Sequence, residues 1–370
     1  MTGPKRTTIA ENLPATVPFV GPEAQERQRG RPFSARLGAN ESVFGPSPKA
    51  ISAIEDAAAD AWKYGDPESY SLRQALGTHL GLSMAEIVCG TGIDGLLNSL
   101  VRLYVEPGVT VVTSEGAYPT FNYHVTGYGG DLMKVPYVDD REDPESLLAV
   151  ARDTGARLIY LANPDNPMGS WHSAAIIDEM IAGLPPDCLL VLDEAYVELA
   201  PEGTAPIIDT TNPQVVRLRT FSKAYGLAGM RVGYAFGAGE VIRGFEKVRN
   251  HFGMSRVSQA AALAALDDAG WLASVQEQVA RSRTILSDIA RENGLIPLPS
   301  ATNFVTMDCG GDGDFAKTVL AALIDLDIFV RMPFASPGNR AIRISCGTDE
   351  DMDRVRDALP KALKTARASA

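Results

Sequence analysis

Short apolar runs alternate with stretches of helical periodicity through much of the chain. The runs whose hydrophobicity predicts buried strands span residues 86–90, 109–113, 157–162, 188–193, 215–220 and 233–236. Strands that are apolar on both faces and separated by helices are typical of a mainly parallel sheet covered on both sides. We therefore expect an α/β domain over residues 38–239.

The pattern changes after Gly239, where a mostly helical stretch runs to about Glu292. Strand candidates follow at 303–307, 328–331 and 341–345, and a helix over 349–366 closes the chain. This order indicates a smaller α+β domain over residues 240–370. Residues 1–37 are rich in Pro, Gly, Gln and Arg without a helical or strand period, so we expect an arm that packs on another element or on a partner subunit.

Composition narrows the choice of partners. The chain has 370 residues and a formal net charge of -12, which argues against nucleic acid as a partner because such binding needs clustered Lys and Arg. The four cysteines and four histidines show no metal-ligand or disulfide spacing, so no metal is expected. No apolar run near the N-terminus is long enough for a signal peptide or a membrane helix, and we expect a cytoplasmic protein with no membrane partner.

A glycine-rich segment, Gly90-Thr-Gly-Ile-Asp-Gly95, follows a strand candidate and opens a helix, and Glu115 lies twenty positions after its last glycine. This pattern matches the dinucleotide-binding fingerprint. The physical basis is more general, since free backbone N–H groups at a helix N-terminus bind any phosphate. The segment alone leaves three interpretations open, namely a dinucleotide site, another phosphate site and a structural turn.

Two further residues favour pyridoxal-phosphate chemistry, which needs a lysine for the aldehyde, an acid facing the pyridine nitrogen and donors for the phosphate. Asp193 ends an apolar strand candidate, and Lys223 follows the next one. Both therefore lie where open α/β sheets place their ligands. A partly dry pocket would lower the pKa of Lys223, which suits Schiff-base formation.

Taken together, the motifs resemble the class I/II aminotransferases of fold type I, and among these the histidinol-phosphate aminotransferase group. The resemblance covers nearly the whole chain. The segments that carry it are residues 39–48, 64–67 (Tyr-Gly-Asp-Pro), 90–95, 163–169 (Asn-Pro-Asp-Asn-Pro-Met-Gly), 193–196 (Asp-Glu-Ala-Tyr), 220–231 and 341–345. It implies a large domain with a mainly parallel seven-stranded sheet, a smaller C-terminal domain and a homodimer.

The resemblance also implies a role for each matching residue. Lys223, Asp193 and Tyr196 would be catalytic. The residues implied to bind the cofactor are Gly92, Ile93, Asp94, Ser222 and Arg231 at the phosphate, Tyr118 on the ring face, Asn166 and Tyr196 at the ring oxygen, Asp193 at the ring nitrogen, and Tyr64 from the other subunit. The candidate substrate contacts are Arg343, Asn40, Phe19 and Arg331.

The implied reaction is a ping-pong transamination between an amino donor and a 2-oxo acid, with Lys223 moving a proton. The identity of the donor stays open, because Phe19 stands where the family has a tyrosine that meets substrate phosphate. The proline of the family is also missing after Asn40-Glu41. The alternative functions are an aminotransferase that acts on aromatic amino acids, a threonine-phosphate decarboxylase and, through the glycine-rich segment, an NAD-dependent oxidoreductase.

Overall fold

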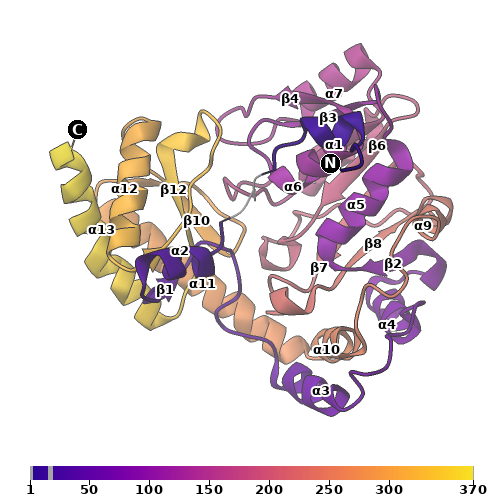
Figure 1. Cartoon of the computed structure of the whole chain (residues 1–370), viewed down its shortest axis with the longest axis horizontal. Helices are drawn as coiled ribbons and strands as arrows, with labels where there is room; N and C mark the ends of the chain where they lie inside the picture. Colours follow the sequence, from indigo (N-terminus) through magenta and orange to yellow (C-terminus); the bar gives the residue numbers. More distant parts are fainter. Residues whose placement is uncertain (1–2, 16–19, 370) are drawn as a thin grey trace.

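A mixed, mainly parallel sheet forms the centre of the large domain. The computed structural model describes residues 3–15 and 20–369, and within these ranges seven strands pair in one sheet (Figure 1). Their order is β2 (Ile87–Gly90), β8 (Gly233–Gly237), β7 (Val215–Thr220), β6 (Leu189–Asp193), β5 (Leu158–Ala162), β3 (Thr110–Ser114) and β4 (Asp131–Val135). Strand β8 runs antiparallel to both of its neighbours, and the other pairs are parallel. The predicted seven-stranded α/β fold is confirmed.

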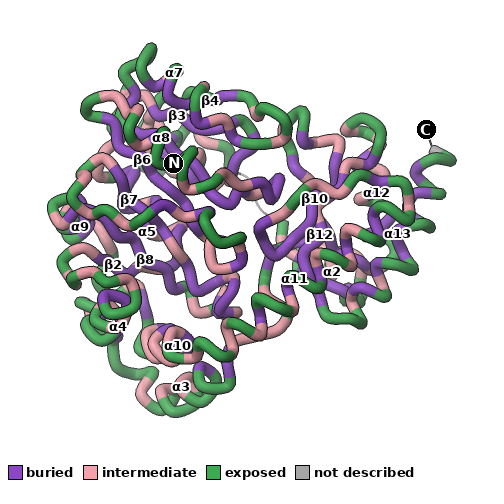
Figure 2. The backbone as a smooth tube through the Cα atoms, turned by 180° about the vertical axis from the view of Figure 1, so that it is seen from behind, coloured by how far each residue is buried: buried purple, intermediate pink, exposed green. Residues whose placement is uncertain are grey.

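Alternate residues of each central strand face opposite helical layers, as the pleat of a strand requires. In β5, Leu158 and Tyr160 pack with α5 (Gly92–Tyr104), α6 (Pro119–Gly127) and α9 (Gly239–Phe245). Ile159 and Leu161 pack on the other side with α7 (Pro144–Thr154) and α8 (Ala174–Ala182). Figure 2 shows the central strands buried and the outer helix faces exposed. Burial on both faces explains why these strands read as continuous apolar runs.

A third helical group covers the β2 end of the sheet. It consists of α3 (Pro48–Ala58), α4 (Tyr70–Leu80) and α10 (Arg256–Leu266). The long helix α11 (Ala269–Glu292) then leads into the small domain (Figure 1).

The small domain packs two further helices, α12 (Gly313–Asp325) and α13 (Asp349–Ser369), against a short antiparallel sheet. The sheet order is β12 (Ala341–Ser345), β10 (Phe304–Asp308) and β9 (Ile296–Pro297). A separate pair joins β11 (Ile328–Phe329) to β1 (Ala35–Arg36) in parallel. The N-terminal arm therefore adds a strand to the small domain of its own chain.

The N-terminal arm, residues 1–37, contains helices that no hydrophobic period in its sequence marks. The structure has helices α1 (Thr8–Asn12) and α2 (Pro22–Arg29), the second ended by Gly30 in the left-handed region at φ 70°. Helix α2 is polar on all sides, so no hydrophobic period marks it. It is held from outside, since Glu26 accepts hydrogen bonds of 3.0 Å from Phe33 N and Arg36 Nε. No helix in the described part of the chain combines the length and apolar character needed to cross a membrane.

Candidate active site

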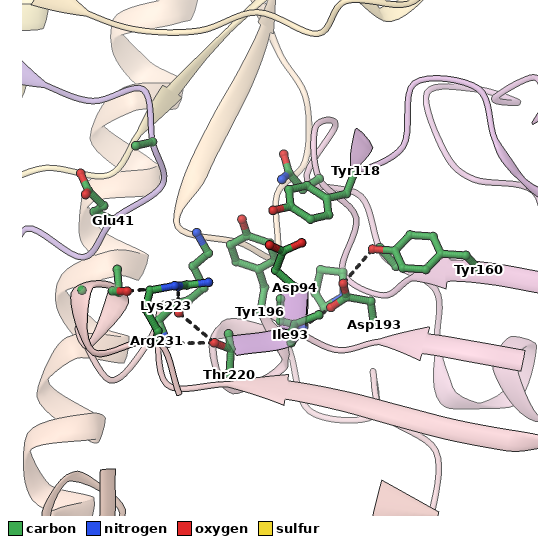
Figure 3. A pocket seen from close by; sticks show the side chains of 18 residues that line it. Glu41, Ile93, Asp94, Tyr118, Tyr160, Asp193, Tyr196, Thr220, Lys223 and Arg231 are labelled. Atoms are coloured by element: carbon green, nitrogen blue, oxygen red, sulfur yellow. Dashed lines mark hydrogen bonds between the residues drawn. The ribbon is translucent and has the colours of Figure 1, made fainter. Parts of the chain in front are cut away.

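A cavity of about 360 Å³ lies where the carboxyl ends of β2, β5, β6 and β7 meet. Because β8 is antiparallel, its amino end reaches the same edge, where Gly233 pairs with Gly90 of β2 and Thr220 of β7. Open α/β sheets bind ligands at this edge. The predicted residues that line the cavity are Ile93, Asp94, Tyr118, Asn166, Asp193, Tyr196, Ser222, Lys223 and Arg231 (Figure 3).

Lys223 lies three positions after the last residue of β7 and points into the cavity (Figure 3). Its Nζ donates a hydrogen bond of 3.1 Å to the carbonyl oxygen of Asn40 and lies 5.5 Å from the ring centre of Tyr196. Burial of the amine, followed by the charge of Arg343, lowers the pKa of Lys223 to about 8. A substantial fraction is therefore the neutral, nucleophilic amine near physiological pH.

Asp193 is the last residue of β6 and is 5% exposed. Its Oδ2 accepts a hydrogen bond of 2.7 Å from the hydroxyl of Tyr160, and its Oδ1 accepts one of 3.0 Å from Ala195 N. Burial raises the pKa of Asp193 to about 6. Among the described residues it forms no ion pair. A protonated pyridine nitrogen would supply the missing cation, so this carboxyl fits pyridoxal phosphate.

A phosphate site lies at the start of α5. Gly92 has φ +73°, and a side chain there would place Cβ 2.6 Å from Nη2 of Arg231. Only glycine lets the guanidinium come this close to the helix N-terminus, whose free N–H groups favour an anion. Nη1 of Arg231 donates a hydrogen bond of 3.4 Å to Oγ of Ser222. Backbone N–H groups, a hydroxyl and a cation thus converge as a phosphate requires.

Asn40 and Arg343 contact the two side chains that are predicted to donate to the ring oxygen of the cofactor, Tyr196 and Asn166. The hydroxyl of Tyr196 accepts a hydrogen bond of 3.1 Å from Nδ2 of Asn40, and burial raises its pKa. Arg343 Nη1 donates to Oδ1 of Asn166. Because the amide oxygen is taken, the Nδ2 donor of Asn166 is left for an acceptor such as the ring oxygen of the cofactor.

A second cavity of about 560 Å³ adjoins the first and shares Tyr118, Asn166 and Lys223 with it. Arg331 and Arg343 line it, and their backbones pair across an isolated bridge. Burial, and next among the lowering causes the nearby Arg331 charge, lowers the pKa of Arg343 to about 10. Among the described residues neither arginine forms an ion pair, so the two cations are available to an anion.

The dinucleotide interpretation of the glycine-rich segment is wrong. In that fingerprint, the acid ends the strand next to the glycine turn. Here β2 and β3 are separated by β8, β7, β6 and β5, which at the usual strand spacing is about 24 Å. Glu115 follows β3 and is exposed. It cannot reach a ribose bound at Gly92.

The family model that matches the chain is aminotransferase class I and II, over residues 35–359. The chain belongs to the class I and II aminotransferases. The predicted enzyme class, a pyridoxal-phosphate-dependent aminotransferase, is therefore confirmed.

Three of the similar proteins carry the name histidinol-phosphate aminotransferase, one of them as putative. The structure of histidinol-phosphate aminotransferase from Sinorhizobium meliloti, in complex with pyridoxal-5'-phosphate, is 53% identical, has a TM-score of 0.95 and covers 100% of this chain and 99% of that one. Histidinol-phosphate aminotransferase from Erythrobacter litoralis is 36% identical over 99% of both chains. A structure described as a putative histidinol-phosphate aminotransferase from Erwinia carotovora is 28% identical, with a TM-score of 0.83 over 89% of this chain and 96% of that one.

The resemblance assigns Tyr64 to the cofactor site of the other subunit and Phe19 to the substrate. Tyr64 is 76% exposed, does not line the cavity of its own chain and contacts the ring of Phe252 at 4.9 Å. Phe19 lies outside the described residues. Its neighbour Val20 accepts a hydrogen bond of 2.7 Å from Nη2 of Arg331, so the arm passes the second cavity.

Sequence reasoning missed Tyr160, which lies inside the apolar run of β5 and donates to Asp193. Its ring is stacked on Phe121 at 4.6 Å, which resembles an ordinary core contact. The available signal was its position, since the register pairs Ala162 with Asp193 and so brings the ends of β5 and β6 together. It also missed Glu41, which lines the first cavity (Figure 3).

Proposed function

We propose that this aminotransferase takes histidinol phosphate as its amino donor and a 2-oxo acid as its acceptor. The proposal rests on two guanidinium groups, Arg331 and Arg343, which line the cavity next to Lys223 and form no ion pair with any described residue. A phosphate monoester is a dianion, and paired arginines recognise it with several charge-assisted hydrogen bonds. The name histidinol-phosphate aminotransferase, which the relatives from Erythrobacter litoralis and Sinorhizobium meliloti carry, supports the same donor.

The first cavity has the donors that pyridoxal phosphate needs. Lys223 would hold its aldehyde carbon, Asp193 its ring nitrogen, and the turn of Gly92, Ile93 and Asp94, with Ser222 and Arg231, its phosphate. Tyr118 would cover the ring face, while Asn166 and Tyr196 would donate to the ring oxygen. Bound there, the cofactor would supply a ring that accepts electron density from the substrate carbon bearing the amino group.

Each protein group then has one task in the transfer. Arg343 and Arg331 hold the anionic end of the donor, which places the amino-bearing carbon beside Lys223. The amine of Lys223, with its pKa lowered to about 8, moves the proton at this carbon. Asn40 accepts from Lys223 through its carbonyl and donates to Tyr196 through its amide, so it positions both groups.

The experiment is a panel of amino donors presented to the purified enzyme in the absence of an acceptor. We expect histidinol phosphate, but neither an aromatic amino acid nor threonine phosphate, to bleach the visible absorbance of the cofactor. Release of carbon dioxide from threonine phosphate would instead support the decarboxylase. Bleaching by aromatic amino acids alone would overturn the proposed donor.

The proposed assembly is a homodimer in which Tyr64 reaches the cofactor phosphate of the other subunit. Trp62, Tyr64 and Phe252 are 80%, 76% and 54% exposed, and large aromatic groups in such a cluster are enriched at subunit interfaces. Light scattering measures the mass of the assembly and so tests whether it is a dimer. Mixing Tyr64→Ala with Lys223→Ala subunits tests the crossing, since a mixed dimer would regain one intact site.

We also propose that the enzyme works in the cytoplasm. The cysteines Cys89, Cys188, Cys309 and Cys346 are all free and buried, which suits a reducing compartment. Fractionation of the source cells with an antibody against the enzyme checks this location.

A further inference from the structure

Two buried carboxyl groups lie beneath the loop that carries Asn166. Asp165, the preceding residue, is 2% exposed, and Glu142, just before α7, is 1% exposed. The two carboxyls interact electrostatically, since the charge of Asp165 raises the pKa of Glu142. No ion pair within residues 3–15 and 20–369 involves either of them. The pair is therefore a buried acidic cluster without a direct cationic partner.

Hydroxyl and backbone donors reach both carboxyls. Glu142 accepts a hydrogen bond of 2.6 Å from the hydroxyl of Ser114 and one of 3.0 Å from Ala162 N. Asp165 accepts bonds of 3.0 Å from the hydroxyl of Tyr137 and from Met168 N. Two ionised carboxylates near each other inside the protein would repel, which favours the retention of one proton by the pair.

Burial and, after it, the charge of Asp165 both raise the pKa of Glu142, which lies well above its ordinary value. Burial raises the pKa of Asp165 to about 7, against the lowering effect of its hydrogen bonds and of Arg343. The titratable groups that face the pair from neighbouring elements are Tyr137, Tyr160, Asp193, Arg343 and, through the backbone of Glu142, His172.

Asp165 also shapes the turn that carries Asn166, the residue that contacts Arg343. Its N–H donates to Ser170 O at 2.8 Å, its carbonyl accepts from Gly169 N at 3.2 Å, and its carboxyl holds Met168 N. The next residue, Asn166, accepts from Arg343. The position of the guanidinium therefore depends on this turn, and its charge is partly balanced by the acidic pair.

We propose that Glu142 and Asp165 hold one proton between them, and that Asp165 is a positioning residue that fixes Asn166 and Arg343 for the anionic group of the substrate. This inference rests on the proposed function only for the choice of amino donor. The proton is retained whichever donor the enzyme takes.

Infrared spectroscopy of the holoenzyme detects the shared proton directly. At about pH 8.5, Asp193 and Glu198, with pKa values of about 6 and about 7, are mainly ionised. We expect the carbonyl stretch of a protonated carboxyl in the wild type, its loss in Glu142→Gln, and its retention in the matched control Glu198→Gln. A wild type without the band, or a band that survives Glu142→Gln, overturns the shared proton.

Kinetics test the positioning role. Asp165→Ala should raise KM for histidinol phosphate about tenfold with kcat changed less than about threefold, as expected for a lost charge-assisted hydrogen-bond network. Asp165→Asn, which keeps an acceptor for Met168 N, should restore most of the loss. An unchanged KM in Asp165→Ala overturns the role, and so does an Asn variant as defective as the Ala variant.

The two proposals fail in different ways. If histidinol phosphate is not the donor, the wild type itself shows no turnover with it while the infrared band behaves as described. If Asp165→Ala does not fold, as its melting temperature would show, the Asn variant and the infrared comparison still decide the inference.

Discussion

The hydroxyl of Tyr160 donates a hydrogen bond of 2.7 Å to Oδ2 of Asp193, and both groups are buried. This bond lowers the pKa of Asp193 against the larger raising effect of burial. Tyr160 therefore keeps the carboxyl ionised and directed into the cavity.

Replacing Tyr160 by Phe should raise the pKa of Asp193 further, so that the acid pairs less well with a protonated ring nitrogen. We expect kcat to fall about tenfold, the effect of one hydrogen bond to a charged group. Steady-state kinetics and cofactor titration check this. Tyr104→Phe, at the far end of α5, is the control, and a Tyr160→Phe enzyme with wild-type kcat would contradict the role.

The pH dependence of cofactor attachment reports the state of Lys223. Its lowered pKa of about 8 means that the fraction of neutral amine rises with pH and levels off above this value. The rate at which the apoprotein binds pyridoxal phosphate should follow the same curve. Arg343→Leu removes a cation that lowers this pKa, so the midpoint should move to higher pH. Arg331→Gln should leave the midpoint in place, and an equal shift in both variants would contradict this explanation.

Much of the large domain could be predicted because its strands are buried on both faces. The limits of β7 and β12 agree with the predicted runs 215–220 and 341–345. Strand β4 was not predicted, because it is an edge strand with several exposed residues and has no continuous apolar run. Helix α2 was missed because it also has no apolar period. Contacts with Phe33 and Arg36, which lie outside the helix, hold it in place.

The site residues also divide into those that could be predicted from the sequence and those that could not. Asp193 ends one buried strand and Lys223 follows the next, so their positions could be predicted. Glu115 seemed to complete a dinucleotide fingerprint because spacing along the chain does not reveal strand order, and β3 lies far from β2. The Glu142–Asp165 pair could not be predicted, because its members come from different loops that only the folded sheet brings together.

Arg331 should make the enzyme prefer a donor that carries a phosphate over one that lacks it. We expect Arg331→Gln to lower kcat/KM for histidinol phosphate about thirtyfold, the loss of ~2 kcal/mol from a charge-assisted contact. The same variant should leave kcat/KM for histidinol, which lacks the phosphate, nearly unchanged. An equal loss for both donors would show that Arg331 acts on the site as a whole.

The buried ion-pair network behind the site should contribute to stability. Glu194 is 1% exposed in its side chain and pairs with Arg217 at 2.6 Å and with Arg219 at 2.9 Å. Arg217→Leu leaves this carboxylate short of a partner and should lower the free energy of unfolding by about 3 kcal/mol. Denaturant unfolding measures it. Arg291→Leu, which breaks an exposed pair with Asp288, is the control and should have little effect.

The most direct measurement is to reduce the holoenzyme with borohydride, digest it and locate the cofactor by mass spectrometry. Our account predicts a pyridoxyl group on Lys223 alone, and no attached cofactor in Lys223→Ala treated in the same way. A pyridoxyl group on another lysine of the wild type, or a visible, reducible chromophore that persists in Lys223→Ala, would contradict it.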